Sequence, residues 1–470
     1  MKNINYKNIS LLIIAIGSLI IGMTGCKKFI QIGPPISSLE TSTVFEDPIA
    51  ATAAQLRIYT TLPDISYNIS ANNGLLSDEL KAYSTLPLYV ELYSNSMLAS
   101  NAPTFWGDAY ANIYKANANI EGLSNSKSIN SKVKNQLLGE AKFVRAFFFF
   151  YLTNLYGDLP LTLTSDYNVN KSISRSPQAL VYTQIEKDLN EAKDLLADNF
   201  VDVSDTTITT ERVRPTKAAA KSLLARTYLS EGKYSQALNE STDVISNSLF
   251  ALPTDLNSVF LKNSEEAIWQ IQVPAPNTIN TVEGQNFILL TPPVAGYNTN
   301  VAIANTLLDS FEIGDLRKAN WIGSIAANST TYYFPYKYKV QTGSDVTEYT
   351  MVLRLAEQYL IRAEANANLN NLNDATNDLN TIRTRAGLSN YSGPSSKDSI
   401  LAAIYKERKL ELFTEWGHRW LDLKRTNQID TYMPSITALK GGTWRASKKW
   451  YPIPQSEVGA NPKLTQNQDY

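Results

Sequence analysis

The feature that most constrains the fold is the aromatic stretch from Gly139 to Pro160, GEAKFVRAFFFFYLTNLYGDLP. From Phe143 to Tyr156 nearly every side chain is apolar, and no helical or strand period separates a wet face from a dry one. A helix that is apolar on all sides is buried on all sides. Gly157 predicts its end. The run falls short of the ~20 apolar residues that span a bilayer, and Lys142 and Arg145 interrupt its start. It predicts the central helix of a helical domain.

The beginning of the chain has the pattern of an export signal. Lys2 and Lys7 precede a short apolar run, ISLLIIAIGSLIIGM, which ends in small residues, as in a secretory signal peptide. The tetrapeptide Met23-Thr24-Gly25-Cys26 resembles a bacterial lipobox. Cys26 is also the only cysteine, so it has no disulfide partner. We therefore predict a lipoprotein signal peptide at residues 1–25 and lipidation of Cys26.

Composition excludes several classes of function. Removing residues 1–25 takes away two lysines and no acid, so the net charge goes from −1 to −3, and no basic run favours nucleic acid. The single histidine, His418, and the lone cysteine are too few for a zinc cluster or for a Ser/His or Cys/His nucleophilic site. No dinucleotide, P-loop or EF-hand pattern occurs. We expect no cofactor and no metal site, and a structural role for His418.

Two helix pairs have tetratricopeptide spacing. In RPTKAAAKSLLARTYLSEGKYSQALNES, Gly232 marks the turn, Tyr228 and Tyr234 are the aromatic residues that plug the gap, and Ala237 is the small residue where two helices cross. A weaker copy, LIRAEANANLNNLNDA, contains Ala375, which lies 375 − 237 = 138 residues after the first alanine. The repeats are therefore not a plain tandem array, and something is inserted between them.

The residues between the repeats differ in character. At roughly 251–345, alternating patterns predict short strands at Trp269–Val273 and Tyr336–Val340. The loops between them are rich in Pro, Gly, Asn and aromatic residues, as binding loops often are. Residues 66–104 are polar and aromatic, and we expect mostly loop there. The expected organisation is one domain, 26–470, with an N-terminal helical half (26–250), a loop and short-strand insertion (251–345) and a C-terminal helical half (346–470).

One charged residue falls on a buried helix face. In the helix DSILAAIYKERKLELFTEWG, Arg408 lies on the same side as the apolar residues. A buried arginine needs a carboxylate. Glu411 and Glu415 are the local candidates for that partner.

Four segments together resemble the SusD/RagB family of Bacteroidetes outer-membrane nutrient-uptake lipoproteins. They are the lipobox at Cys26, the aromatic helix GEAKFVRAFFFFYLTNLYGDLPL, ERKLELFTEWGHRWLDLKR at 407–425 and YPIPQSEVGANPKLTQNQDY at 451–470. The resemblance implies a mostly α-helical, SusD-like fold with tetratricopeptide-type helix pairs, anchored at the cell surface in the outer membrane. It also implies a SusC-like TonB-dependent barrel as partner, which the protein would cap like a lid while it delivers a glycan, or in some members a peptide.

The residues leave other functions open. A glycoside hydrolase needs only two carboxylates, and Asp78 and Glu79 are the pair to consider, although a cap or loop anchor is the simpler interpretation. A peptide-binding lid would need an apolar or strand-edge groove. The repeats alone would also suit a protein-interaction scaffold. Because the loops offer tyrosine and asparagine, we favour a non-catalytic glycan-binding lid.

The ligand site is expected in two loops. A sugar site needs rings that face water beside hydrogen-bonding groups. One stretch follows Asp78-Glu79 and contains Tyr83, Tyr89 and Tyr93; the other is Gly296-Tyr297-Asn298. In the family that the chain resembles, comparable loops build the pocket, and Tyr297 stands where a ring that stacks on sugar often lies. We predict ligand contacts from Tyr297, Asn298, Tyr83 and Tyr89, with Asp78 as a hydrogen-bond acceptor.

Overall fold

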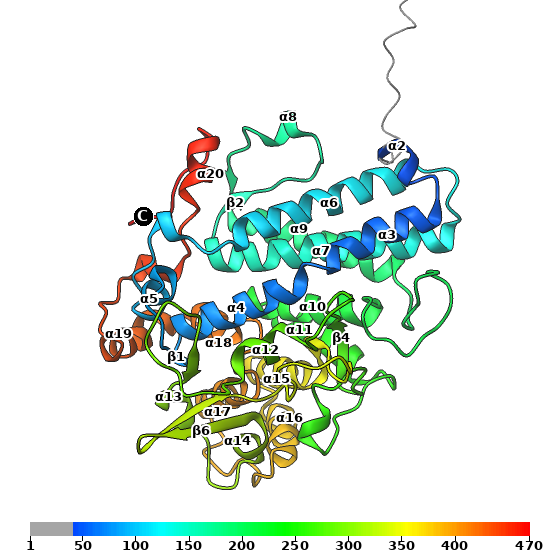
Figure 1. Cartoon of the computed structure of the whole chain (residues 1–470). Coiled ribbons are helices and arrows are strands. Elements are labelled where there is room, and N and C mark those ends of the chain that lie inside the picture. The colour runs from blue at the N-terminus through cyan, green and yellow to red at the C-terminus, as the bar shows by residue number, and fades with distance from the viewer. Residues whose placement is uncertain (1–40) are drawn as a thin grey trace, which may run out of the picture. The chain divides into compact units, whose positions relative to one another are not determined.

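The structure, a computed structural model, describes residues 41–470 (Figure 1). One unit ends at Val44 and includes the short helix α2 (Thr41–Val44); the other runs from Phe45 to Tyr470 and contains the remaining helices and strands of the described chain. This second unit is mostly helical, with short paired strands, which confirms the predicted fold class. None of the helices in the described part of the chain is both long and apolar enough to span a bilayer. The predicted signal peptide and Cys26 lie outside the described residues.

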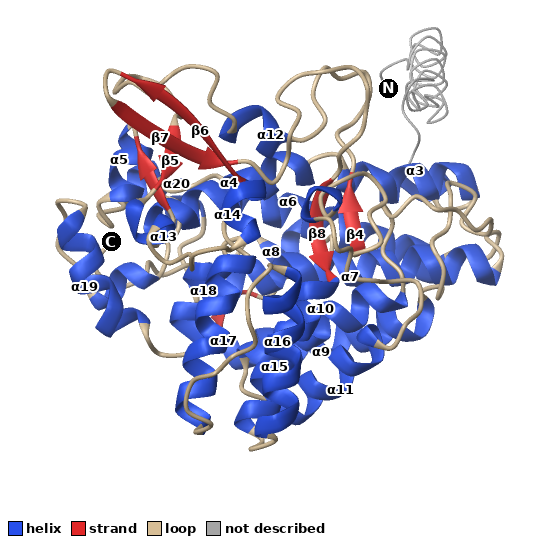
Figure 2. Ribbon diagram, turned by 90° about the horizontal axis from the view of Figure 1, so that it is seen from below, coloured by secondary structure: helices blue, strands red, loops and turns tan. Residues whose placement is uncertain are grey.

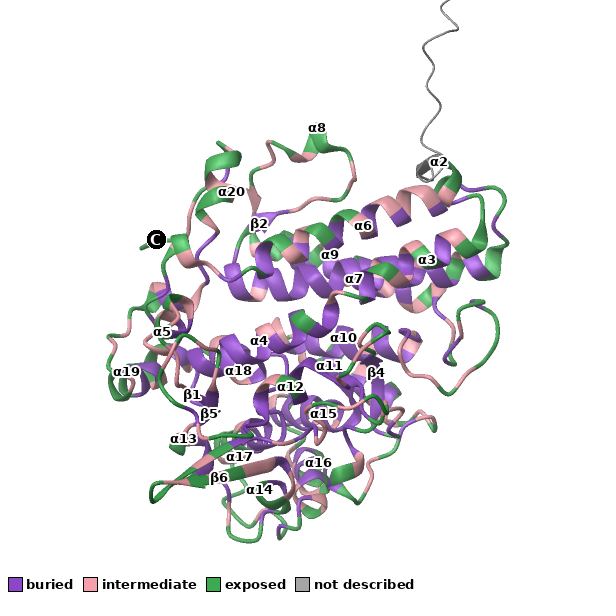
Figure 3. Ribbon diagram, viewed as in Figure 1, coloured by how far each residue is buried: buried purple, intermediate pink, exposed green. Residues whose placement is uncertain are grey.

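The central helix is α7 (Ser131–Tyr156), as the aromatic stretch predicts. It begins where Asn130 Oδ1 accepts from Val133 N at 3.1 Å, and it ends at Gly157, whose φ of 80° suits glycine. Figure 3 shows most of α7 buried between its neighbouring helices, and only its first turns carry exposed residues. Each buried phenylalanine contributes roughly 1.5–3 kcal/mol of transfer free energy. The other helices of this half are α3 (Pro48–Tyr59), α4 (Leu62–Leu76), α5 (Pro87–Tyr93), α6 (Phe105–Asn125), α8 (Tyr167–Asn170) and α9 (Gln178–Leu195).

The two tetratricopeptide-type helix pairs form as predicted. They are α10 (Lys217–Ser230) with α11 (Tyr234–Ile245), and α15 (Leu355–Asn368) with α16 (Leu372–Arg385). Ala237 and Ala375 are fully buried. The turn residues Gly232 and Asn370 both adopt positive φ, 72° and 67°. Because α11 packs on α15, the two repeats are neighbours in space despite the insertion between them.

In the described part of the chain, the strands form four antiparallel pairs. These are β1 (Leu80–Ala82) with β5 (Val301–Ile303), β2 (Leu159–Pro160) with β3 (Arg175–Ser176), β4 (Ala267–Ile271) with β8 (Thr350–Arg354), and β6 (Ile322–Ala327) with β7 (Thr330–Pro335). Figure 2 shows the β6–β7 hairpin next to β5. The strand expected at Trp269 exists as β4. The strand expected at Tyr336–Val340 is wrong, because Lys337 does not face water: its ammonium is buried and donates to the Glu411 and Phe413 carbonyls, each at 2.9 Å.

The expectation of mostly loop at 66–104 is also wrong. Helix α4 continues to Leu76 and α5 follows it. The polar side chains of α4 are buried and bonded inside the protein: Ser66 donates to Glu283, and Asn73 Nδ2 donates to the Ile69 carbonyl at 2.8 Å. A buried core helix can therefore have a polar sequence that looks like a loop.

The C-terminal helices correct the expected partner of Arg408. Its guanidinium pairs with Asp422 at 2.8 Å. Glu411 and Glu415 instead bind Arg354, each at 2.7 Å. Helix α18 (His418–Arg425) packs against α17 (Lys397–Glu411), and this contact brings Asp422 to Arg408. The remaining helices are α12 (Val282–Phe287), α13 (Asn305–Leu308), α14 (Leu316–Trp321), α17 (Lys397–Glu411), α18 (His418–Arg425), α19 (Ile429–Leu439) and α20 (Gln455–Ala460).

Candidate ligand-binding site

The two loops that the sequence singles out lie side by side. Strand β1 pairs with β5, with Leu80 opposite Ile303. Beyond the strands, Tyr83 N donates to the Asn300 carbonyl at 2.9 Å and Thr85 N donates to the Gly296 carbonyl at 2.7 Å. Backbone pairing therefore fixes Tyr83 next to the loop that carries Tyr297.

A cavity of about 450 Å³ opens beside this pairing; we call it the tyrosine cavity. It is lined from β1, β5, β7, α5, α13 and α19. Its lining combines rings, hydroxyl and amide groups, and two lysines: Tyr83, Tyr93, Tyr332, Tyr333, Thr330, Thr331, Asn305, Lys81 and Lys440.

The rings of the tyrosine cavity are partly open to solvent. Tyr83 and Tyr332 meet edge to face, with centroids 5.6 Å apart and an interplanar angle of 77°. Tyr93 is also half-buried and lies on α5. Rings held in place beside hydroxyl groups can stack on one face of a sugar and bond its hydroxyls. The sequence placed Tyr93 near this site but did not single out Tyr332, whose only signal was an aromatic, Asn-rich loop.

Asp78 anchors the cavity wall. Its side chain is fully buried and accepts from Arg419 Nε at 2.8 Å, Lys409 Nζ at 2.8 Å and the Tyr432 hydroxyl at 2.7 Å. Burial raises the pKa of Asp78, but Arg419 and Lys409 outweigh that effect and hold the pKa well below its usual range. The sequence predicts Asp78 as a hydrogen-bond acceptor for the ligand. A carboxylate that already accepts from three donors is better placed to hold the cavity wall together.

Glu79 points elsewhere. It does not line the tyrosine cavity, and its Oε2 accepts from Thr414 N at 3.4 Å. Burial, together with the charge of Asp78, raises the pKa of Glu79 to about 8. The two carboxyl groups therefore do not face one shared cleft, as the pair of a glycoside hydrolase must.

The other predicted residues do not line the tyrosine cavity. Tyr89 is only 7% exposed and belongs to the core, so its ring offers no face to a ligand. Tyr297 is 83% exposed at the tip of its loop. Asn298 is half-buried and closes its own loop, donating to the Val294 carbonyl at 3.1 Å and accepting from Asn300 N at 2.9 Å. Neither Tyr297 nor Asn298 lines the tyrosine cavity, so a ligand would contact Tyr297 only if it extended beyond the cavity.

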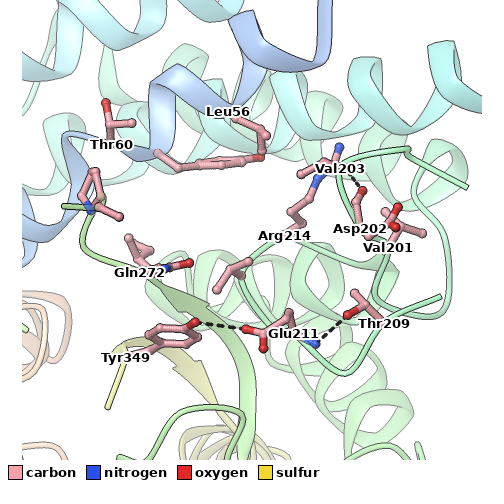
Figure 4. Close-up of a pocket in the computed structure, with 15 residues that line it drawn as sticks. Leu56, Thr60, Val201, Asp202, Val203, Thr209, Glu211, Arg214, Gln272 and Tyr349 are labelled. Carbon is pink, nitrogen blue, oxygen red and sulfur yellow. Dashed lines mark hydrogen bonds between the residues drawn. The ribbon is translucent and has the colours of Figure 1, made fainter. Parts of the chain in front are cut away.

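A second pocket, of about 440 Å³, lies between α3, the loop 201–214 and the end of β4 (Figure 4). Its walls are mainly apolar, and several of its polar groups are already bonded to the protein. The Tyr349 hydroxyl donates to Glu211 at 3.1 Å, and Arg214 pairs with Glu140 at 2.7 Å and with Asp205. It therefore lacks the converging free polar groups of the tyrosine cavity.

His418 is buried at the start of α18, with Nε2 3.9 Å from Glu357. Burial lowers its pKa to about 4, although the nearby Glu357 opposes the shift. Among the described residues, no group of three or more His, Cys, Asp or Glu side chains is arranged to hold a metal ion.

Comparisons with known proteins agree with this architecture. A family model described as the SusD family matches residues 315–470, and one described as starch-binding associating with outer membrane matches residues 64–229. The SusD-like protein P2 of Formosa agariphila is 28% identical, over 68% of this chain and 71% of its own length.

Solved structures share the fold. A SusD superfamily protein from Bacteroides vulgatus superposes with a TM-score of 0.75 at 21% identity, covering 91% of this chain and 100% of that one. A structure described as a laminarin-binding SusD-like protein gives a TM-score of 0.70 at 24% identity, covering 89% and 99%. The fold is thus the α-helical fold of the SusD superfamily. The chain is a SusD-like protein.

Proposed function

We propose that this protein is a non-catalytic, lipid-anchored protein of the outer membrane that binds a glycan at the cell surface. It would deliver the glycan to a SusC-like TonB-dependent barrel and act as its lid. A solved relative is described as laminarin-binding, and one matching family model is described as starch-binding and associated with the outer membrane. Both descriptions support a glycan ligand for this chain.

The observation that carries the proposal is the tyrosine cavity. It places three partly exposed rings, Tyr83, Tyr93 and Tyr332, beside the hydroxyl groups of Thr330 and Thr331. This combination suits a sugar, whose ring faces stack on aromatics while its hydroxyls bond to polar groups. Glu79 does not line the cavity and Asp78 is held by three donors, so the described residues of the lining offer binding groups without a pair of catalytic carboxylates.

Calorimetry with laminarin oligosaccharides and other glycans tests this proposal. Tyr83→Ala removes a ring of the cavity and should weaken glycan binding by roughly 1–3 kcal/mol, allowing for lost stacking and burial. Tyr297→Ala, made separately and combined with it, shows whether the exposed loop contributes. Tyr114→Ala, at an exposed tyrosine of α6, is the matched control. Full-strength glycan binding by the Tyr83 and Tyr297 double variant would place the site elsewhere.

A further assay separates binding from catalysis. Incubation of the purified protein with the bound glycan should release no new reducing ends. Turnover that disappears in Asp78→Asn or Glu79→Gln would instead support a surface hydrolase.

A further inference from the structure

Lys81 is a cation without a carboxylate partner at the tyrosine cavity. It lies on β1 with an exposed side chain, and its Nζ is 5.0 Å from the centroid of the Tyr83 ring. Within the described part of the chain, no carboxylate reaches ion-pair distance of this ammonium, whereas Lys409, behind the wall, pairs with Asp78 at 2.8 Å. A ligand in the tyrosine cavity would therefore meet the Tyr83 ring and the Lys81 ammonium side by side.

The cavity wall does not neutralise that charge. Asp78 is the only acid among the described residues that line it, and two cations, Lys409 and Arg419, each 2.8 Å away, already hold it. Glu79, behind Asp78, is protonated at neutral pH because burial and the Asp78 charge raise its pKa to about 8. The charged groups around the cavity therefore leave an excess of positive charge.

The carbonyl end of α4 adds no free negative potential. Lys440 covers it, donating to the carbonyls of Leu75 at 2.7 Å, Leu76 at 2.9 Å and Ser77. Helix C-termini carry partial negative charge, and a cation placed there offsets it. Burial lowers the pKa of Lys440 to about 7, so it contributes part of a further positive charge at neutral pH.

We propose that the tyrosine cavity selects glycans that carry negative charge, as a uronate carboxylate or a sulfate ester, and that Lys81 contacts that charge. The inference rests on the proposed glycan-binding function and adds a substrate class to it. The sugar ring would lie against Tyr83 and Tyr332, while its anionic substituent meets the Lys81 ammonium. An ammonium and an oxyanion form a charge-assisted hydrogen bond, stronger than one between neutral groups.

Paired ligands that differ only in charge test the proposal. Calorimetry compares alginate oligosaccharides with their carboxyl-reduced forms, and sulfated galactan oligosaccharides with their desulfated forms; the two pairs distinguish carboxylate from sulfate. We expect at least one anionic member to bind more tightly than its neutral partner, with affinity falling as salt rises. Lys81→Gln should weaken that binding about three- to tenfold, while Lys81→Arg retains most of it. Lys187→Gln, at an exposed lysine of α9 outside the cavity lining, should leave it unchanged.

The outcomes separate this inference from the proposed function. Neutral members that bind as tightly as their charged partners, with Lys81→Gln silent, would overturn the charge selection and leave glycan binding intact. The charge selection would also be overturned, and glycan binding left intact, if laminarin oligosaccharides bind in a Tyr83-dependent way while no anionic ligand binds. Failure of every glycan, neutral or charged, would overturn both.

Discussion

At the scale of single residues, Glu79 is the buried acid whose protonation most clearly depends on folding. Burial and the neighbouring Asp78 raise its pKa from 4.5 to about 8, against the opposing charges of Arg419 and Lys337 and the hydrogen bond from Thr414. Between those pH values the folded protein holds a proton that the unfolded chain has released. The contribution of Glu79 to the free energy of unfolding is therefore fully present below pH 4.5, and it is lost as the pH rises through about 8.

Glu79→Gln should remove this pH dependence, because glutamine is a neutral substitute for the protonated acid. We expect similar melting temperatures for wild type and variant near pH 5, and a variant several degrees more stable near pH 9, in line with the ~1.4 kcal/mol of each pKa unit. Glu265→Gln, at an exposed glutamate, serves as the control. Parallel melting curves for Glu79→Gln and wild type across this range would show that Glu79 ionises normally.

At the scale of elements, the helix crossing at Ala237 depends on a small side chain. Ala237 on α11 is fully buried in the stack of α10, α11 and α15. Ala237→Trp should overpack that crossing and lower stability by about 1–3 kcal/mol. Gln236→Trp, one position earlier and exposed, is the control in the same urea titration. An unchanged midpoint for Ala237→Trp, with selective loss of glycan binding, would contradict its role in the fold.

Elements with a strong local pattern could be predicted from the sequence. The aromatic run became α7, and the spacing around Ala237 and Ala375 became two helix pairs. Elements whose pattern is set by distant contacts could not. The polar side chains of α4 are bonded to Glu283 and to the helix itself, so a buried helix has the composition of a loop. Lys337 alternates with tyrosines like a solvent-facing residue, yet it is buried against carbonyls from another segment.

The candidate site could be predicted only in part, because local composition marks its loops but distant packing decides which rings face the cavity. Tyr83 lies in a polar, aromatic stretch and Tyr297 in an aromatic, Asn-rich loop, and the structure joins them by backbone pairing. Which rings face a cavity depends on packing. Tyr89 turns into the core, whereas Tyr332, which no motif marks, lines the cavity from β7.

At the scale of the whole molecule, a buried charge cluster ties distant segments together. Arg354, at the end of β8, contacts Glu266 at 2.8 Å and both Glu411 and Glu415 at 2.7 Å. Glu266 lies just before β4, Glu411 is the last residue of α17, and Glu415 follows α17. Arg354→Met would leave these buried carboxylates without that partner, and we expect a loss of about 3–5 kcal/mol, typical of breaking a buried ion pair. Arg57→Met, at an exposed arginine of α3, should change stability by less than about 0.5 kcal/mol. Similar denaturation midpoints for the two variants would show that the cluster is not essential to the fold.

The proposed function also requires the molecule to stay at the membrane, and that requirement falls on Cys26. A lid that delivers ligand to a barrel must be held beside it, and a single acyl chain binds membranes only weakly, at ~0.8 kcal/mol per buried CH₂. We therefore expect Cys26 to carry more than one acyl chain. In cell fractionation, wild type should stay with the outer membrane, and Cys26→Ala should leave it. The comparison needs a strain without the barrel partner, because binding to the barrel could retain the variant without a lipid. If Cys26→Ala remains as firmly bound as wild type in that strain, the protein is held by something other than a lipid on Cys26.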